Sequence, residues 1–221
     1  LEKEIENRSK KITNWEDAYL KDSVSLFGYS QLMKNIRIAK SWNRDDDLKK
    51  YFDIATTYYS PIYPDHPYSQ YIDMNIESYN KIKIGGKYID FTLPDFTGKP
   101  VKLSKEIDGK IAVINLWASW CGPCRRLSKS MIPIYEDYKD KGFTIVGVAR
   151  EENADSGIKA AKQDNYPWLN LLEVGDTANI WKLYGIGNSG GSTFLVDRDG
   201  TILAIHPTAE ELRKILEEKL K

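Results

Sequence analysis

The sequence predicts an α/β domain, a central mixed sheet flanked by helices, preceded by a small all-helical N-terminal domain. The first third of the 221-residue chain repeats apolar residues at helical spacing. Past Gly85-Gly86, strand-like apolar runs alternate with helical patterns, which is typical of a sheet with crossover helices. One of these runs leads directly into the two cysteines of the chain, Cys121 and Cys124.

The predicted helical domain covers residues 1–83. Its apolar residues recur at intervals that place them on one face of each of several helices. These residues are Ile5, Ile12, Trp15 and Tyr19, then Leu32, Ile36 and Ala39, then Leu48, Tyr51, Phe52 and Ala55, and finally Tyr71, Ile72, Ile76 and Tyr79. The run Asp45-Asp46-Asp47 predicts a helix start, and the prolines of residues 61–67 predict a loop. We expect three or four helices, with the tyrosines either in the core or on a partner-binding surface.

The predicted α/β domain covers residues 84–221. Residues 111–117 form a near-continuous apolar run, as expected of a central strand covered on both faces. Residues 124–138 read as the helix that follows it. Residues 143–149 read as the next strand, parallel to the first if the crossover is right-handed.

The last part of the chain predicts a hairpin and a helix. Residues 193–197 and 201–205 flank Arg198-Asp199-Gly200, which is an Asp-Gly hairpin signal. The final helix has Thr208 as its expected N-cap and a continuous apolar face. That face consists of Leu212, Ile215, Leu216 and Leu220.

Charge and hydropathy narrow the classes of partner. The 32 basic and 32 acidic residues cancel, which argues against nucleic acid and against an electrostatic membrane footprint. No run approaches the roughly 18 apolar residues of a membrane helix. The chain opens at Leu1 in a charged stretch, so we expect a processed or trimmed piece whose lack of a signal peptide says nothing about compartment.

The cysteine pair lies where a strand meets a helix, the arrangement that thiol–disulfide exchange requires. The exposed helix start favours the thiolate on Cys121, and the two-residue spacing lets Cys124 approach within bonding distance. We expect Cys121 to attack and Cys124 to resolve the mixed disulfide. Arg125 and Arg126 would lower the pKa of Cys121, unless they only form a solvated helix face.

Two other roles for the cysteine pair stay open, a metal site and a structural or vestigial disulfide. A tetrahedral zinc site needs four ligands, and the chain adds only the distant His66 and His206. A disulfide that closes a two-residue loop stabilises little. We therefore predict redox chemistry without a metal or cofactor, and interpret His206 as a structural residue.

The run Trp117-Ala118-Ser119-Trp120-Cys121-Gly122-Pro123-Cys124-Arg125 resembles the active site of thioredoxin-fold proteins. More narrowly, it resembles the bacterial extracytoplasmic TlpA/ResA branch, which is related to AhpC/TSA and redoxin proteins. The stretches 86–96, 98–104 and 141–148 support that branch, and the resemblance covers about residues 84–221. It implies a thioredoxin fold with extra N-terminal strands.

The resemblance also implies a function, that of a thiol–disulfide oxidoreductase acting on protein or peptide thiols and disulfides. It implies an upstream thiol electron donor, a site outside the cytoplasm (the periplasm or the outer surface of a bacterial membrane), and room for a membrane anchor outside these residues. The dipeptide Gly122-Pro123 resembles that of thioredoxin, whose potential lies near ~−270 mV, so we expect a reductant.

Two further residues have expected roles with alternatives. Trp120 is suited to pack beside a docked peptide, with plain rim packing as the alternative. Asn115 stands six residues before Cys121, where cytosolic thioredoxins carry a buried Asp and the TlpA-like branch commonly has Asn. We give Asn115 a supporting role, with capping of neighbouring backbone groups as the alternative.

Two positions depart from the family pattern. Relatives often carry a Glu three residues after the second cysteine, and here that residue is Leu127. Family members place a cis-proline before the strand that faces the active site, and here Gly191 stands in its place. Because a non-proline cis bond costs roughly 3 kcal/mol, we expect Gly191 to be trans and the sulfurs to be less shielded. The expected substrate-binding residues are Trp120, Gly122, Pro123, Gly191 and Ser192.

Two alternative functions remain. The stretch before the cysteines also resembles peroxiredoxin-related chains, which suggests a thiol peroxidase. Those enzymes set a Pro and a Thr ahead of the reactive cysteine, and Trp117, Ala118 and Ser119 stand here instead. The other alternative is a binding module in which the helical domain recruits a partner or the two sulfurs hold a metal.

Overall fold

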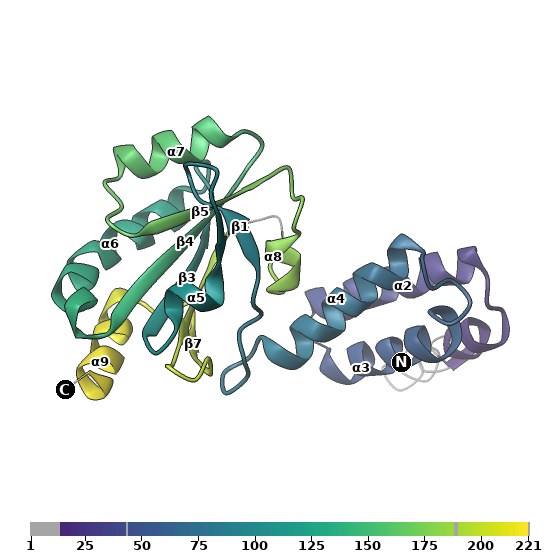
Figure 1. The fold of residues 1–221 in the computed structure, drawn as a ribbon. Helices are drawn as coiled ribbons and strands as arrows, with labels where there is room; N and C mark the ends of the chain where they lie inside the picture. The colour runs from purple at the N-terminus through teal and green to yellow at the C-terminus, as the bar shows by residue number, and fades with distance from the viewer. Residues whose placement is uncertain (1–13, 43, 188–189, 221) are drawn as a thin grey trace, which may run out of the picture. The chain divides into compact units, whose positions relative to one another are not determined.

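The computed structural model describes residues 14–42, 44–187 and 190–220, and the chain divides into two compact units between Ile76 and Glu77. The first unit is helical and the second contains the sheet (Figure 1). Helix α4 (Pro67–Lys81) runs through this division. The predicted domain boundary, between residues 83 and 84, falls just after α4 and stays a prediction.

The first unit has the predicted helices. Residues 14–22 are helical, and α2 (Leu26–Ser41), α3 (Asp45–Ile54) and α4 follow, with a π-helical turn, η1 (Ala55–Tyr59), directly after α3. The Ser25 hydroxyl accepts from the Gly28 N–H at 3.1 Å and so caps the start of α2. The expected position of Ile5 and Ile12 on the first helix lies outside the described residues.

Aromatic side chains form much of the core of this first unit. Tyr29 and Tyr59 are fully buried with ring centroids 4.8 Å apart, and the Tyr29 hydroxyl lies 2.8 Å from the Ser69 hydroxyl. Tyr29 and Tyr59 therefore belong to the core and do not form a partner-binding surface, which was the other role considered for the tyrosines. The apolar face predicted for α2 is confirmed, because Leu32, Ile36 and Ala39 are buried.

The second unit is built on a five-stranded mixed sheet in the order β5-β4-β3-β6-β7. The central strand, β3 (Ile111–Trp117), is buried along its whole length, as predicted. It pairs in parallel with β4 (Phe143–Glu151), which pairs in parallel with β5 (Leu169–Val174). On its other side β3 pairs antiparallel with β6 (Ser192–Val196), and β6 pairs antiparallel with β7 (Ile202–Ile205).

Helices cover both faces of this sheet (Figure 1). One face packs against α6 (Gly122–Tyr138), α7 (Ala154–Gln163) and α9 (Ala209–Lys219). Right-handed β3-α6-β4 and β4-α7-β5 crossovers place α6 and α7 together on that face. The other face is covered by α5 (Leu103–Ile107), α8 (Ile180–Leu183) and the short hairpin of β1 (Thr92–Pro94) and β2 (Pro100–Lys102). This hairpin supplies the predicted extra strands.

The predicted N-cap of the last helix and the predicted hairpin turn are both present. The Thr208 hydroxyl accepts from the Glu211 N–H, and the Glu211 carboxylate accepts from the Thr208 N–H, which forms a capping box at α9. Gly200 has φ +83°, a left-handed conformation that favours glycine in the β6–β7 turn. Among the described residues, no helix combines the length and the apolar character needed to cross a membrane.

Candidate active site

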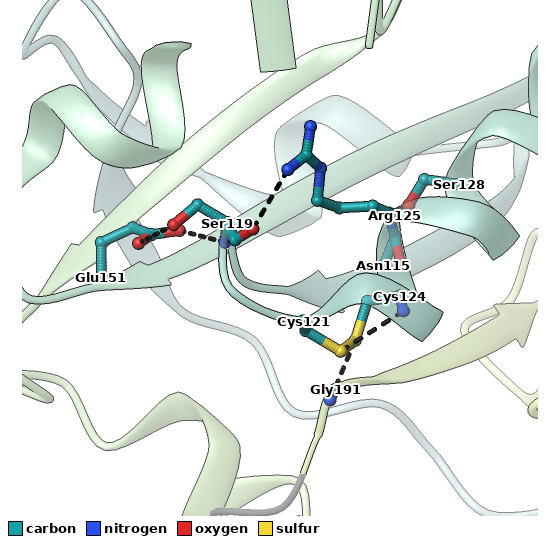
Figure 2. The surroundings of a disulfide bond; sticks show 8 residues. All are labelled: Asn115, Ser119, Cys121, Cys124, Arg125, Ser128, Glu151 and Gly191. Carbon is teal, nitrogen blue, oxygen red and sulfur yellow. Dashed lines mark hydrogen bonds between the residues drawn. A yellow bond between two sulfur atoms is a disulfide. The ribbon is translucent and has the colours of Figure 1, made fainter. Parts of the chain in front are cut away.

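Cys121 and Cys124 form a disulfide at the junction of β3 and α6, with Cα atoms 5.3 Å apart (Figure 2). Cys121 is the N-cap residue of α6, and its sulfur accepts from the Cys124 N–H at 3.3 Å. A helix N-terminal amide aimed at a sulfur favours its thiolate. The expectation that Cys121 is exposed is wrong for this disulfide form, since Cys121 is 5% exposed and Cys124 is only partly buried.

The second sulfur contacts the backbone of Gly191. The Gly191 N–H donates to the Cys124 Sγ at 3.2 Å. A Cβ at this position would lie 1.9 Å from the Leu116 carbonyl oxygen, so glycine lets the chain approach the sulfur closely. The Gly191 peptide bond is trans, as expected. The Gly191 backbone contacts this sulfur on one side, and the cavity described next lies beside it, so the expectation of less shielding stays a prediction.

A cavity of about 180 Å³ lies beside both sulfurs. The cavity is lined by four of the predicted site residues in addition to the cysteines. They are Asn115, Pro123, Gly191 and Ser192. Leu127, Thr193 and His206 also line it. The predicted residues Trp120 and Gly122 are exposed and lie outside this lining.

The sequence predicts a structural role for His206, yet this residue lines the cavity beside the cysteines. It directly follows β7, adopts a left-handed φ of +55°, and donates its N–H to the Thr193 carbonyl at 2.8 Å. Its local sequence carries no catalytic pattern. The pairing of β6 with β7 brings it to the site, which explains why the sequence alone did not reveal its position.

Trp120 is 55% exposed and packs against a second indole. Its ring centroid lies 5.9 Å from that of Trp181 on α8, and the Arg150 guanidinium lies 4.8 Å from the Trp181 ring centroid. Arg150 is itself paired with Asp176. An exposed aromatic face is thus supported next to the disulfide.

Asn115 lies buried beneath the site. Its Nδ2 donates to the Ser128 Oγ at 2.9 Å, and Ser128 lies one turn beyond Cys124 on α6. The hydrogen bond links β3 to the helix that carries the second cysteine. Asn115 thus bonds to a side chain, rather than to the backbone groups considered as an alternative.

Arg125 is engaged away from the sulfurs. Its Nε and Nη2 donate to the two carboxylate oxygens of Asp164 at 2.6 Å and 3.0 Å, and its Nη1 donates to the Ser119 carbonyl at 3.3 Å. The guanidinium holds the pKa of Asp164 below its ordinary value. Arg126 is exposed. Arg125 therefore ties α6 to the residue that ends α7 and is not merely a solvated side chain, and its expected effect on Cys121 stays a prediction.

We expect the Arg125–Asp164 pair to give a pH-dependent contribution to stability. Because the pKa of Asp164 is depressed in the folded state, the stabilisation is present above the unfolded pKa of about 3.9 and is lost as pH falls through the folded value. Asp164→Asn should lower the free energy of unfolding by about 1–3 kcal/mol near neutral pH. Urea denaturation between pH 7 and pH 2 should show that gap closing in acid, and a constant gap would refute the assignment.

Glu151 holds the loop before Cys121, a role that the sequence does not predict. This side chain is 4% exposed at the end of β4. One carboxylate oxygen accepts from the Ser119 N–H at 2.5 Å and the other from the Ser119 hydroxyl at 2.7 Å (Figure 2). The two residues are 32 positions apart, so no local pattern marks the contact.

Glu151→Ala should lower the free energy of unfolding by about 1–3 kcal/mol, because it leaves the Ser119 donors without their acceptors. It should also slow disulfide exchange by loosening the loop that positions Cys121. Glu151→Gln is the matched control, since its amide oxygen still accepts from the Ser119 N–H and its NH₂ can donate to the hydroxyl. Equal losses in both variants, measured by urea denaturation, would mean that charge and not hydrogen bonding matters.

The chain is similar to known proteins over its second unit. Residues 84–205 match the AhpC/TSA family. A thiol-disulfide oxidoreductase ResA of Bacillus thuringiensis subsp. konkukian is 31% identical over 141 residues, which are 64% of this chain and 79% of that protein. The helical residues before 84 lie outside the family match.

Solved structures give the same result. The thioredoxin domain of a thiol-disulfide oxidoreductase from Bacteroides vulgatus has a TM-score of 0.58 and 27% identity, and the match covers 64% of this chain and 100% of that domain. A thiol:disulfide interchange protein from Bacteroides sp. has a TM-score of 0.57 and 27% identity, with 63% and 91% covered. The predicted thioredoxin fold is thereby confirmed.

Proposed function

The chain belongs to the AhpC/TSA family and, within it, to the ResA-type thiol-disulfide oxidoreductases, and on that premise we propose that Cys121 and Cys124 are its reactive groups. The observation that carries this proposal is the disulfide between them at the start of α6, beside a cavity. A CxxC pair at a helix N-terminus is the arrangement in which thiolates are activated for exchange.

In the proposed reaction Cys121 attacks first. The Cys121 thiolate attacks one sulfur of a substrate disulfide, a mixed disulfide forms, and the other substrate sulfur leaves as a thiolate. Cys124 then attacks the Cys121 sulfur, which releases the second substrate thiolate and forms the Cys121–Cys124 disulfide. The Cys124 N–H directed at the Cys121 Sγ supports Cys121 as the first nucleophile.

The proposed direction is reduction of protein or peptide disulfides, with an upstream thiol donor that returns the pair to the dithiol. The Gly122-Pro123 dipeptide supports this direction. Asn115 supports the site from below, and the cavity lining by Pro123, Gly191 and Ser192 supports substrate contact there.

The substrate surface continues outside the cavity. The exposed Trp120 and Gly122 would contact a docked peptide at the rim, and the large exposed part of the Trp120 ring supports this role beside plain rim packing against Trp181. The proposed location is extracytoplasmic, on the basis of the resemblance to the TlpA/ResA branch. For the helical residues before 84 we propose recognition of a partner, because they carry no cysteine.

The function is tested by comparing insulin reduction with peroxide consumption. The protein, supplied with dithiothreitol, should reduce insulin disulfides and consume hydrogen peroxide no faster than buffer does. Rapid peroxide consumption without insulin reduction would overturn the proposal in favour of a thiol peroxidase. A protein that starts near Lys83 should fold and still reduce a small disulfide if the preceding helices serve recognition. If it folds but loses this activity, those helices must shape the active site.

A further inference from the structure

The backbone N–H of Gly191 points at one of the two reacting sulfur atoms, the Cys124 Sγ. Both sulfurs of the disulfide accept from a backbone N–H, Cys121 from Cys124 at 3.3 Å and Cys124 from Gly191 at 3.2 Å (Figure 2). The first donor is the ordinary consequence of a helix start. The second comes from a chain segment 67 positions away and reaches the sulfur that the helix start does not serve.

We propose that the backbone N–H of Gly191 is a catalytic group that stabilises the thiolate forming on Cys124. This inference rests on the exchange reaction proposed above and adds a donor to it. Glycine makes this contact without displacing its neighbours, whereas a Cβ would meet the Leu116 carbonyl oxygen at 1.9 Å and the Cys124 Sγ at 3.2 Å. A proline here would have no N–H to donate.

The Gly191 N–H acts in the reaction that returns the enzyme to its dithiol form. The thiolate of the upstream thiol donor attacks the Cys121 Sγ, the Cys121–Cys124 bond breaks, and its electron pair goes to the Cys124 Sγ, which leaves as a thiolate. A second thiol of that donor then displaces the Cys121 thiolate, which completes the dithiol and leaves the donor as a disulfide. A hydrogen bond to an ionised acceptor is roughly twice as strong as a neutral one, so the amide stabilises the product of the first step more than the starting disulfide. A leaving thiol of lower pKa also departs faster.

Few other groups near Cys124 can perform this task. Among the described residues, the titratable side chains that share the cavity with it are Cys121 and His206. From α6, Arg125 is bound to Asp164 and Leu127 carries no charge. The strands beside the sulfur contribute the neutral Asn115, Ser192 and Thr193.

The first test is made on the wild-type protein, so that it does not depend on a variant folding. The reduced, ¹⁵N- and ¹³C-labelled protein is titrated from pH 5 to pH 11 by NMR. The Gly191 amide proton should move downfield with the midpoint of the Cys124 Cβ resonance, and this transition should vanish in Cys124→Ser. A Gly191 amide that stays constant while Cys124 ionises would overturn the inference.

The second test compares Gly191→Pro with Gly191→Ala. Both add a Cβ against the Leu116 carbonyl, but only the alanine variant keeps the N–H. The pKa of Cys124 should be about one unit higher in the proline variant than in the alanine variant. Dithiothreitol should reduce the Cys121–Cys124 disulfide several-fold more slowly in the proline variant than in the alanine variant. Equal pKa values and rates in the two variants would refute the role of the amide.

These outcomes separate this inference from the proposed function. If wild type reduces insulin but its Gly191 amide does not follow Cys124, only the amide loses its role. If wild type shows no exchange at all while the amide does follow Cys124, the hydrogen bond exists but the proposed function fails.

Discussion

Cys124→Ser should accumulate covalent complexes with substrate proteins, whereas Cys121→Ser should exchange disulfides at the background rate and trap none. In the first variant Cys121 still attacks a substrate disulfide, but no second sulfur is present to resolve the mixed disulfide. In the second, the remaining thiol lies inside α6 and lacks the helix-start amide that serves Cys121. Non-reducing electrophoresis after incubation with insulin whose disulfides are intact measures the trapping.

This experiment decides a question that burial leaves open. In the disulfide Cys121 is more buried than Cys124, and each sulfur accepts from one backbone N–H, so exposure would favour Cys124 while the helix start favours Cys121. Trapping by Cys121→Ser alone, or equal trapping by both variants, would reverse or remove the assigned order. The Cys121→Ser/Cys124→Ser double variant is the control for complexes that do not depend on these sulfurs.

Trp117→Ala should lower the free energy of unfolding by about 3–5 kcal/mol. Trp117 is fully buried at the end of β3, its ring meets Tyr166 edge-on at 5.1 Å, and its Nε1 donates to the Asn170 Oδ1 at 3.2 Å. This hydrogen bond passes over β4 at Gly147, where a Cβ would lie 2.1 Å from the Asn170 Oδ1. The indole thus joins three strands beneath the active site.

Trp117→Phe is the matched control for this prediction. It keeps most of the buried ring and removes the N–H donor, so the loss should be smaller, about 1–2 kcal/mol. Urea denaturation of the oxidised proteins measures both values. A loss below about 1 kcal/mol for the alanine variant would mean that the neighbouring side chains close the cavity, contrary to the close packing of interiors.

The sequence predicts the elements whose signals are local. The apolar run of β3, the N-cap at Thr208 and the Asp-Gly turn ending in Gly200 each depend on residues a few positions apart, and each is confirmed. Strand β5 (Leu169–Val174) is not marked in the same way. It contains the buried polar residues Asn170 and Glu173, so its pattern is neither alternating nor continuously apolar.

The candidate site likewise has local features, which the sequence predicts, and contacts between distant residues, which it does not predict. The cysteine pair is local, and its place at a strand–helix junction is visible in the sequence. The Glu151–Ser119 and Gly191–Cys124 contacts join residues that are far apart along the chain, and only the sheet register brings them together. The position of His206 beside the cavity has the same cause.

The central place of β3 in the sheet has a consequence for biosynthesis. Strand β3 is made before its neighbours, and β6, which pairs along its second edge, is among the last strands to be made. During synthesis Cys121 and Cys124 therefore emerge long before Gly191 can reach them. Contacts of such large sequence separation form slowly because the intervening loop must close first. For a period after synthesis, the two cysteines are therefore exposed to the redox conditions of their surroundings before the Gly191 segment has formed its contact with Cys124.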